Sequence, residues 1–240
     1  MRILALETSA KAVSCALLED GKRLAFSFQN SGLTHSRTLM PMVDDMLRNC
    51  ECDKHSIDVI ACAVGPGSFT GLRIGIAAAK GLAWGLEKPC AGVSTLLAMA
   101  AQMEKTDDIV VAVMDARRNQ FYNAVFDCSS GEPRRLCEDR AIDINELADE
   151  LEKLGKSVLL VGDGAELCCE LLSKRGAAFP FRIAGEDHRW QSAWGVALCA
   201  YEMAKKGELV SAEALTPVYL RLSQAERERL ERLEREGKTE

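Results

Sequence analysis

The sequence has few aromatic residues and few histidines. Phe, Trp and Tyr make up only 5% of its 240 residues, which argues against a base-stacking surface for nucleic acid. The three histidines, His35, His55 and His188, include no pair spaced to hold a metal on one helix face, and their scarcity argues against a Ser–His–Asp site. No apolar run approaches the ~18 residues of a membrane span. We therefore expect a soluble, cytosolic protein.

The sequence also lacks an excess of positive charge. It contains 30 basic and 36 acidic residues, which gives a net charge of −6 and an isoelectric point of about 5.3. A protein that binds phosphate backbones without help usually carries the opposite sign. Any nucleic acid is therefore expected to be bound mainly through a partner.

Cysteine is abundant, but its spacing does not indicate a disulfide framework. Most of the ten cysteines lie in apolar runs such as residues 60–64, where a free thiol behaves as a small hydrophobe in a reducing compartment. Cys50, Cys52 and His55 form one metal-like cluster, but no fourth ligand is near. A solvated loop at a helix end is the stronger interpretation.

Hydrophobic periodicity predicts strands that alternate with helices along the chain. The first half is expected to contain strands at 3–6, 14–18, 24–28 and 57–64 and helices at 34–49, 70–86 and 93–103. The second half is expected to contain strands at 109–114, 121–126, 157–161 and 218–220, one more strand between 135 and 142, and helices at 143–154, 165–175 and 190–206. Pro41 either kinks the helix at 34–49 or lies in its first turn after a cap at Thr38.

The polar residues 104–108 suggest a boundary between two similar α/β units. We expect one subdomain at 1–104, a second at 105–222, and a charged helix or tail at 223–240. The helix at 190–206 is expected to pack back on the first subdomain.

A glycine-rich segment at residues 65–75, GPGSFTGLRIG, follows a buried-type strand and opens a helix. Such a turn presents backbone N–H groups and the positive helix end to an anion. The lysine of a Walker loop and the glycine spacing of a dinucleotide site are both missing. A tight turn capped by Ser68 or Thr70 is the stronger interpretation, and a vestigial phosphate loop is the alternative. The candidate loop residues are Gly65, Gly67, Ser68, Thr70 and Gly71, with Gly162 and Gly164 from a second glycine turn.

The helix after this turn carries small residues at every fourth position, namely Gly71, Gly75, Ala79 and Ala83. Such a ridge lets another backbone approach closely, either within the chain or from a second subunit. Methionines 40, 42 and 46 on the preceding helix fit a core stripe or an adaptable partner surface.

Two acids, Glu7 and Asp115, follow predicted strands, where α/β proteins bind ligands. Either could be catalytic, and each could instead be a turn or ion-pair residue.

Several motifs together resemble the TsaB (YeaZ) family. They are residues 4–9 (LALETS), 35–41 (HSRTLMP), 65–75, 115–118 (DARR) with Tyr122, 162–165 (GDGA) and 217–221 (PVYLR). The resemblance covers residues 4–221 in order, and the glycine-rich string is its most specific part. It implies an α/β, actin-like (ASKHA, ribonuclease H-like) fold with two similar βββαβα-type subdomains.

The resemblance also implies a role in forming threonylcarbamoyladenosine beside the anticodon of tRNAs that read codons starting with A. In that family TsaB pairs with TsaD, the metal protein that transfers the threonylcarbamoyl group, and the ATPase TsaE joins them. The helices that match 34–49 and 70–86 pair with their counterparts on the partner. The implied interface residues are His35, Arg37, Leu39, Met42, Val43, Met46, Phe69, Leu72, Arg73, Gly75, Ile76, Ala79, Lys80 and Ala83.

The catalytic relatives carry two histidines one helical turn apart, and the matching residues 94–100 contain none. Without these ligands nothing holds a metal to polarise the carbamoyl carbonyl. We therefore expect a non-catalytic subunit without its own metal or tightly bound cofactor. ATP or ADP is expected only at an interface of the complex, and a homodimer is expected when the partner is absent.

Two other functions remain open on the sequence. The first is an actin-like ATP-dependent phosphotransferase, with the glycine turns as phosphate loops and Glu7 or Asp115 placing Mg²⁺. It is weakened by the missing P-loop lysine. The second is a peptidase, the label inherited with this family, which is weakened by the absence of a metal pair or a nucleophile with a nearby histidine.

Overall fold

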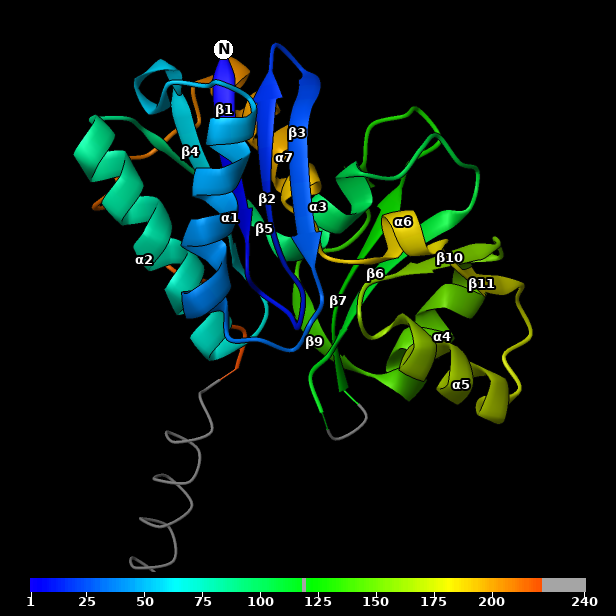
Figure 1. Cartoon of the computed structure of the whole chain (residues 1–240). Coiled ribbons are helices and arrows are strands. Elements are labelled where there is room, and N and C mark those ends of the chain that lie inside the picture. The colour runs from blue at the N-terminus through cyan, green and yellow to red at the C-terminus, as the bar shows by residue number, and fades with distance from the viewer. Residues whose placement is uncertain (118–119, 222–240) are drawn as a thin grey trace, which may run out of the picture.

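The computed structural model describes residues 1–117 and 120–221 and contains two β-sheets that lie side by side (Figure 1). The predicted charged tail at 223–240 lies outside these residues. The first sheet has the order β3-β2-β1-β4-β5 and the second the order β11-β10-β6-β7-β8, with β9 paired to β7. We call each sheet with the helices on it a lobe. The division at 104–108 into separate domains stays a prediction.

The first lobe begins with an antiparallel meander that continues into parallel strands. Its strands are β1 (Arg2–Glu7), β2 (Val13–Glu19), β3 (Lys22–Gln29), β4 (Val59–Gly65) and β5 (Cys90–Ser94). Asp20 and Gly21 both have positive φ, as the tight hairpin between β2 and β3 requires. On one face lie α1 (His35–Asn49) and α2 (Phe69–Leu86), and on the other lies α7 (Ala193–Lys206). A short 3₁₀ helix, η1 (Lys54–Ser56), precedes β4.

The second lobe has a similar order of elements. Its strands are β6 (Ile109–Asp115), β7 (Gln120–Asp127), β8 (Arg134–Arg135), β9 (Arg140–Asp143), β10 (Val158–Val161) and β11 (Phe181–Ile183). Its core is closed by α4 (Ile144–Leu154) and α5 (Ala165–Arg175). The helix α3 (Thr95–Ala101) packs against α7 and against the second sheet, so it joins the two lobes. A short helix, α6 (Glu186–Arg189), leads into α7.

Several predicted boundaries need correction. The single strand expected between 135 and 142 is two short strands, β8 and β9, and the helix expected from 93 begins at Thr95 because residues 90–94 form β5. The helix expected from 190 begins at Ala193, where the Ser192 hydroxyl accepts a hydrogen bond from the Trp194 N–H. Pro41 lies inside α1, which starts at His35, so neither a first-turn proline nor a Thr38 cap is correct.

The strand expected at 218–220 is an irregular segment. After α7 the chain crosses back over the first lobe, where the N–H groups and carbonyls of Val210 and Cys90 exchange hydrogen bonds. Further along, the Val218 N–H donates to the Val64 carbonyl at 2.8 Å. We call residues 207–221 the C-terminal strap. In the parts of the chain that the structure describes, no helix is long and apolar enough to span a membrane.

Candidate functional site

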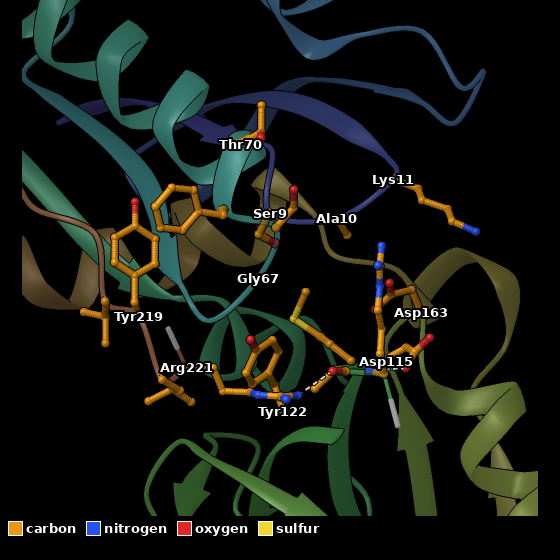
Figure 2. Close-up of a pocket in the computed structure, with 17 residues that line it drawn as sticks. Ser9, Ala10, Lys11, Gly67, Thr70, Asp115, Tyr122, Asp163, Tyr219 and Arg221 are labelled. Carbon is orange, nitrogen blue, oxygen red and sulfur yellow. Dashed lines mark hydrogen bonds between the residues drawn. The ribbon is translucent and has the colours of Figure 1, made fainter. Parts of the chain in front are cut away.

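A cleft of about 590 Å³ opens between the two lobes (Figure 2). Four loops line it, each following a strand of one of the two sheets, together with Tyr122 of β7 and the strap. The lining residues are Ser9–Lys11, Gly67–Thr70, Met114–Arg117, Tyr122, Asp163 and Val218–Arg221. Ligands bind at such strand ends in open α/β sheets, so this cleft is the candidate site.

The glycine-rich turn forms one wall of the cleft. Ser68 is the N-cap of α2, because its hydroxyl accepts a hydrogen bond from the Gly71 N–H at 3.2 Å. The Ser68 N–H donates to the Ser9 carbonyl at 2.7 Å, and a Cβ on Gly67 would lie 2.6 Å from that same oxygen. The segment is therefore a tight turn packed on the β1–β2 loop, capped by Ser68 rather than Thr70. Binding of phosphate there stays a prediction.

The two glycines of the second glycine turn, Gly162 and Gly164, do not line the cleft. Gly162 has a φ of +107°, and a Cβ there would lie 2.1 Å from the Val113 carbonyl oxygen. Gly164 also lies close to the backbone, at Met114 and Asp115. These glycines let the start of α5 pack on β6, and that packing is sufficient to explain them.

Two carboxyl groups, one from each lobe, are close enough to influence each other's charge. Glu7 at the end of β1 is fully buried, and its Oε1 accepts a hydrogen bond from the Ser9 N–H at 2.6 Å. Within the described residues its Oε2 has no hydrogen-bond partner. Burial raises the pKa of Glu7 from 4.5 to about 7, and the nearby charge of Asp163 contributes. Burial also raises the pKa of Asp163, which accepts a hydrogen bond from Gln191 at 2.6 Å.

Of the two acids singled out in the sequence, Asp115 lines the cleft and Glu7 does not. Asp115 is exposed, and its Oδ1 accepts a hydrogen bond from the Arg117 N–H at 2.7 Å. The acid that joins Asp115 in the lining is Asp163, which follows β10 within the GDGA motif and was not predicted as a site residue.

The strap supplies cleft residues that sequence reasoning did not assign to a site. The Tyr219 ring stacks on Phe69 with 4.5 Å between centroids, and the Arg73 guanidinium lies 4.0 Å from the Phe69 centroid. Arg73 Nε also donates to the Tyr219 hydroxyl at 3.1 Å. Arg221 donates to the Ala116 carbonyl of the other lobe at 2.6 Å. Tyr219 and Arg221 belong to the PVYLR motif, but no local sequence pattern indicates that this motif crosses the cleft.

The small-residue ridge of α2 faces inward. Gly75 is buried, and a Cβ there would lie 2.3 Å from the Thr8 Oγ1. The core of the first lobe contains seven of the expected interface residues, namely Leu39, Val43, Met46, Leu72, Ile76, Ala79 and Ala83. The ridge therefore packs within the chain, which is one of the two roles that its spacing allows, and a partner contact through these residues stays a prediction.

The other expected interface residues keep some exposure. Arg37 and Arg73 are exposed, while His35, Met42, Phe69 and Lys80 are half-buried. Three of these already have hydrogen-bond partners within the chain. Arg73 Nε donates to the Tyr219 hydroxyl, His35 Nε2 lies 2.8 Å from the Ala10 carbonyl oxygen, and Lys80 Nζ donates to the Glu213 carbonyl at 3.1 Å.

The cysteine cluster shows no metal-binding geometry. Cys50 is exposed, Cys52 is half-buried, and the Cys52 thiol contacts the Ser56 hydroxyl at 3.6 Å. Across residues 1–117 and 120–221, no three His, Cys, Asp or Glu side chains are grouped so as to hold a metal ion.

The two lobes, the shared helix between them and the cleft at the strand ends define an α/β protein of the actin-like (ASKHA) class. The ethanolamine utilization protein EutJ from Carboxydothermus hydrogenoformans, at 12% identity and a TM-score of 0.53, shares this fold over 82% of this chain and 89% of its own. The family model described as TsaD, tRNA N6-adenosine threonylcarbamoyltransferase, matches residues 29–227.

More specific matches come from proteins of similar length. The chain is 30% identical to the tRNA threonylcarbamoyladenosine biosynthesis protein TsaB of Bacillus subtilis, over 94% of this chain and 96% of the relative. It is 34% identical to the Escherichia coli protein of the same name, over 92% and 95%. The solved structure of YeaZ from Pseudomonas aeruginosa covers 91% of this chain and 99% of its own at 30% identity, with a TM-score of 0.74. The chain belongs to the TsaB (YeaZ) family.

Proposed function

We propose that this chain is a non-catalytic subunit that pairs with the transferase TsaD to form threonylcarbamoyladenosine on tRNA. The modified adenosine would lie beside the anticodon of tRNAs that read codons starting with A. The names of the relatives support the pathway. The observation that supports pairing is an exposed face of α2.

That face carries three small residues, and the two glycines among them lower the stability of an isolated helix. Ala77, Gly81 and Gly85 are exposed and spaced by four residues, so they lie along one side of α2. Among the described residues, no atom lies within 4 Å of a Cβ built on Gly81 or Gly85. Each glycine costs a helix about 1 kcal/mol relative to alanine. Close approach of a partner helix would offset that cost.

Large apolar side chains are exposed on the same helix and on its neighbour. Trp84 is 71% exposed on α2, and Met40 is 40% exposed on the neighbouring α1. Exposed tryptophan and methionine are typical of partner surfaces. Together with the expected interface residues Arg37 and Arg73, which are exposed as well, they define what we call the docking face.

The catalytic step is assigned to the partner. The resemblance places two histidines in the transferases where this chain has residues 94–100. Here Leu96, Ala98 and Met99 of α3 are buried apolar side chains between the lobes. We assign no metal and no tightly bound cofactor to this chain, and we assign ATP or ADP only to an interface of the complex.

The rest of the assembly follows the family. We propose that the ATPase TsaE joins the pair, that tRNA is held mainly by the transferase, and that the complex acts in the cytoplasm. Without its partner the chain is expected to form a homodimer through the same docking face.

Replacing Gly81 with leucine tests the docking face. Because the space around Gly81 is open, the variant is expected to fold, and the added side chain should weaken pairing by at least about tenfold through overpacking. Co-purification with the transferase and a binding titration measure this. Glu152→Leu, an exposed position on α4, is the control for an added surface leucine. Unchanged pairing of the Gly81 variant would exclude this face.

Depleting the protein in cells tests the pathway. The threonylcarbamoyladenosine content of bulk tRNA, measured by mass spectrometry of nucleosides, is expected to fall and to recover when the gene is restored. A normal content after depletion would contradict the proposed function, whatever the pairing assay shows.

A further inference from the structure

The cleft concentrates positive charge in a protein that is acidic as a whole. Among the residues that the structure describes, its lining contains three cations, Lys11, Arg117 and Arg221, against two carboxylates, Asp115 and Asp163, whereas the whole chain carries −6. These cations come from three separate segments, so their proximity is a property of the fold. Burial raises the pKa of Glu7, which accepts a hydrogen bond from the Ser9 N–H at the cleft, to about 7, so this carboxyl group adds less than a full negative charge at neutral pH.

Arg117 is held at the edge of the cleft by its backbone. It has a φ of +63°, an uncommon conformation for a residue other than glycine. Its N–H donates to Asp115 at 2.7 Å, and its carbonyl accepts from the Gln120 N–H at 3.2 Å. The side chain is exposed. A strained turn that presents an exposed arginine to a cleft is typical of a binding site.

Aromatic rings gather at the same cleft despite the low aromatic content of the chain. Two of the three tyrosines, Tyr122 and Tyr219, line it, and Phe69 lines it beside Tyr219. The stack with Phe69 and the bond from Arg73 hold the Tyr219 ring, which is still 38% exposed. Figure 2 shows Tyr219 at one end of the cleft and Lys11 at the other.

One ligand chemistry fits these features together. A nucleotide has a phosphate that cations attract, hydroxyl groups that donate hydrogen bonds to carboxylates, and a flat base that stacks on aromatic rings. The volume of about 590 Å³ lies within the range of about 300–1,000 Å³ for small-ligand sites. Because the open cleft has the Tyr219 ring at one end and Lys11 at the other, a base and its adjoining backbone phosphate can both be bound.

We propose that this cleft binds one unpaired nucleotide of an RNA strand, with its backbone at Lys11 and Arg117 and its base on Tyr219. The choice of RNA over a free nucleotide rests on the proposed function in tRNA modification. This site adds to the main RNA-binding surface, which the transferase provides.

The test uses a fluorescent RNA hairpin with an unpaired loop, added to the full chain alone and to the chain with its transferase. Replacing both Lys11 and Arg117 with alanine is expected to weaken hairpin binding at least about tenfold. The slope of log binding constant against log salt concentration should become shallower by ~0.7 for each phosphate that the variant no longer neutralises. Tyr219→Ala is expected to weaken binding about fivefold or more, and Tyr219→Phe to stay within about twofold of the original protein, because phenylalanine keeps the stacking face.

Three controls separate a loss of RNA binding at the cleft from a general loss of positive charge, of folding or of pairing. Lys22 and Lys54, two exposed lysines outside the cleft, are replaced together and should leave binding unchanged. Arg117→Lys should recover part of the affinity, which a misfolded protein would not. Pairing with the transferase should persist in all cleft variants.

Two results would overturn the inference. The first is hairpin binding by the Lys11/Arg117 variant as tight as that of the original protein. The second is displacement of the hairpin by micromolar ATP or AMP, which would indicate a site for a free nucleotide. If pairing and tRNA modification persist in either case, only this inference fails and the proposed function stands.

Discussion

Replacing Gly71 with alanine is expected to lower the free energy of unfolding by about 3 kcal/mol or more, although alanine is the better helix former. A Cβ on Gly71 would lie 2.1 Å from the Thr8 carbonyl oxygen and 3.3 Å from the Ser68 Cβ. The obstacle is backbone, so no rotamer change relieves it.

Both sides of this close approach are fixed. The Thr8 hydroxyl donates to the Gly71 carbonyl at 2.8 Å, and Ser68 caps the helix through the Gly71 N–H. Moving α2 outward to admit a methyl group would stretch both hydrogen bonds and open the core around Leu72, which is fully buried. Overpacking at the glycine and looser packing of the core would therefore both lower the free energy of unfolding.

Gly81 in the same helix is the matched control. With no atom of the described residues within 4 Å of its Cβ position, Gly81→Ala is expected to raise the free energy of unfolding by about 1 kcal/mol. Urea denaturation measures the change in the free energy of unfolding for each variant, and the two changes should have opposite signs. A Gly71 variant as stable as the original protein would show that α2 does not approach β1 this closely in solution.

The contrast between these two glycines shows what the sequence could predict. Periodicity correctly predicts a helix at 70–86, because apolar residues recur at helical spacing and a capping serine precedes them. Periodicity also reveals one stripe of small residues on that helix, and the exposure of Ala77, Gly81 and Gly85 in the structure adds a second. The stripe that includes Gly71 faces inward because Leu72 and Ile76 beside it are core residues, and the stripe with Gly81 faces outward. Spacing alone does not distinguish them.

The strap shows where local reasoning fails. Alternation at 218–220 is typical of a strand, but β5 is paired with Val210 instead, and Val218 reaches only the Val64 carbonyl. Which segment occupies a sheet edge depends on the path of the chain after α7, and no local pattern encodes that path.

The cleft was predictable only in pieces. The glycine turn and Asp115 can be found because they follow buried strands. Arg117 and Arg221 belong to the DARR and PVYLR motifs, but neither these motifs nor the isolated Lys11 indicates a shared cleft, since basic residues are common on any surface. Their proximity arises from interactions between residues more than a hundred positions apart, such as the bond from Arg221 to Ala116.

Replacing Glu7 with glutamine is expected to make the protein more stable above pH 7 and to change its stability less near pH 4. Burial disfavours the carboxylate, so the folded protein holds a proton on Glu7 up to a pKa of about 7, while the unfolded chain releases it near 4.5. Between these values the unfolded state binds fewer protons, and stability therefore falls as the pH rises. Above pH 7 both states are ionised and this contribution is constant.

The size of the effect follows from that interval. The gap between 4.5 and about 7 corresponds to about 3 kcal/mol of destabilisation at pH 8, all of which glutamine would remove. Glutamine also keeps an oxygen that can accept the hydrogen bond from the Ser9 N–H.

Urea denaturation of the Glu7→Gln variant at pH 4, 6 and 8 tests this directly. Subtracting the original protein's free energy of unfolding at each pH cancels the titration of groups that do not interact with Glu7. Asp163, whose charge raises the pKa of Glu7, is coupled to it, so the difference reports the pair. The difference should grow with pH between about 4.5 and 7 and then level off. Glu152→Gln, an exposed change on α4, controls for substitution of a surface carboxylate. A difference that does not vary with pH would mean that water or a cation reaches Glu7 in solution, and the lobes would then meet less closely than their buried carboxylates imply.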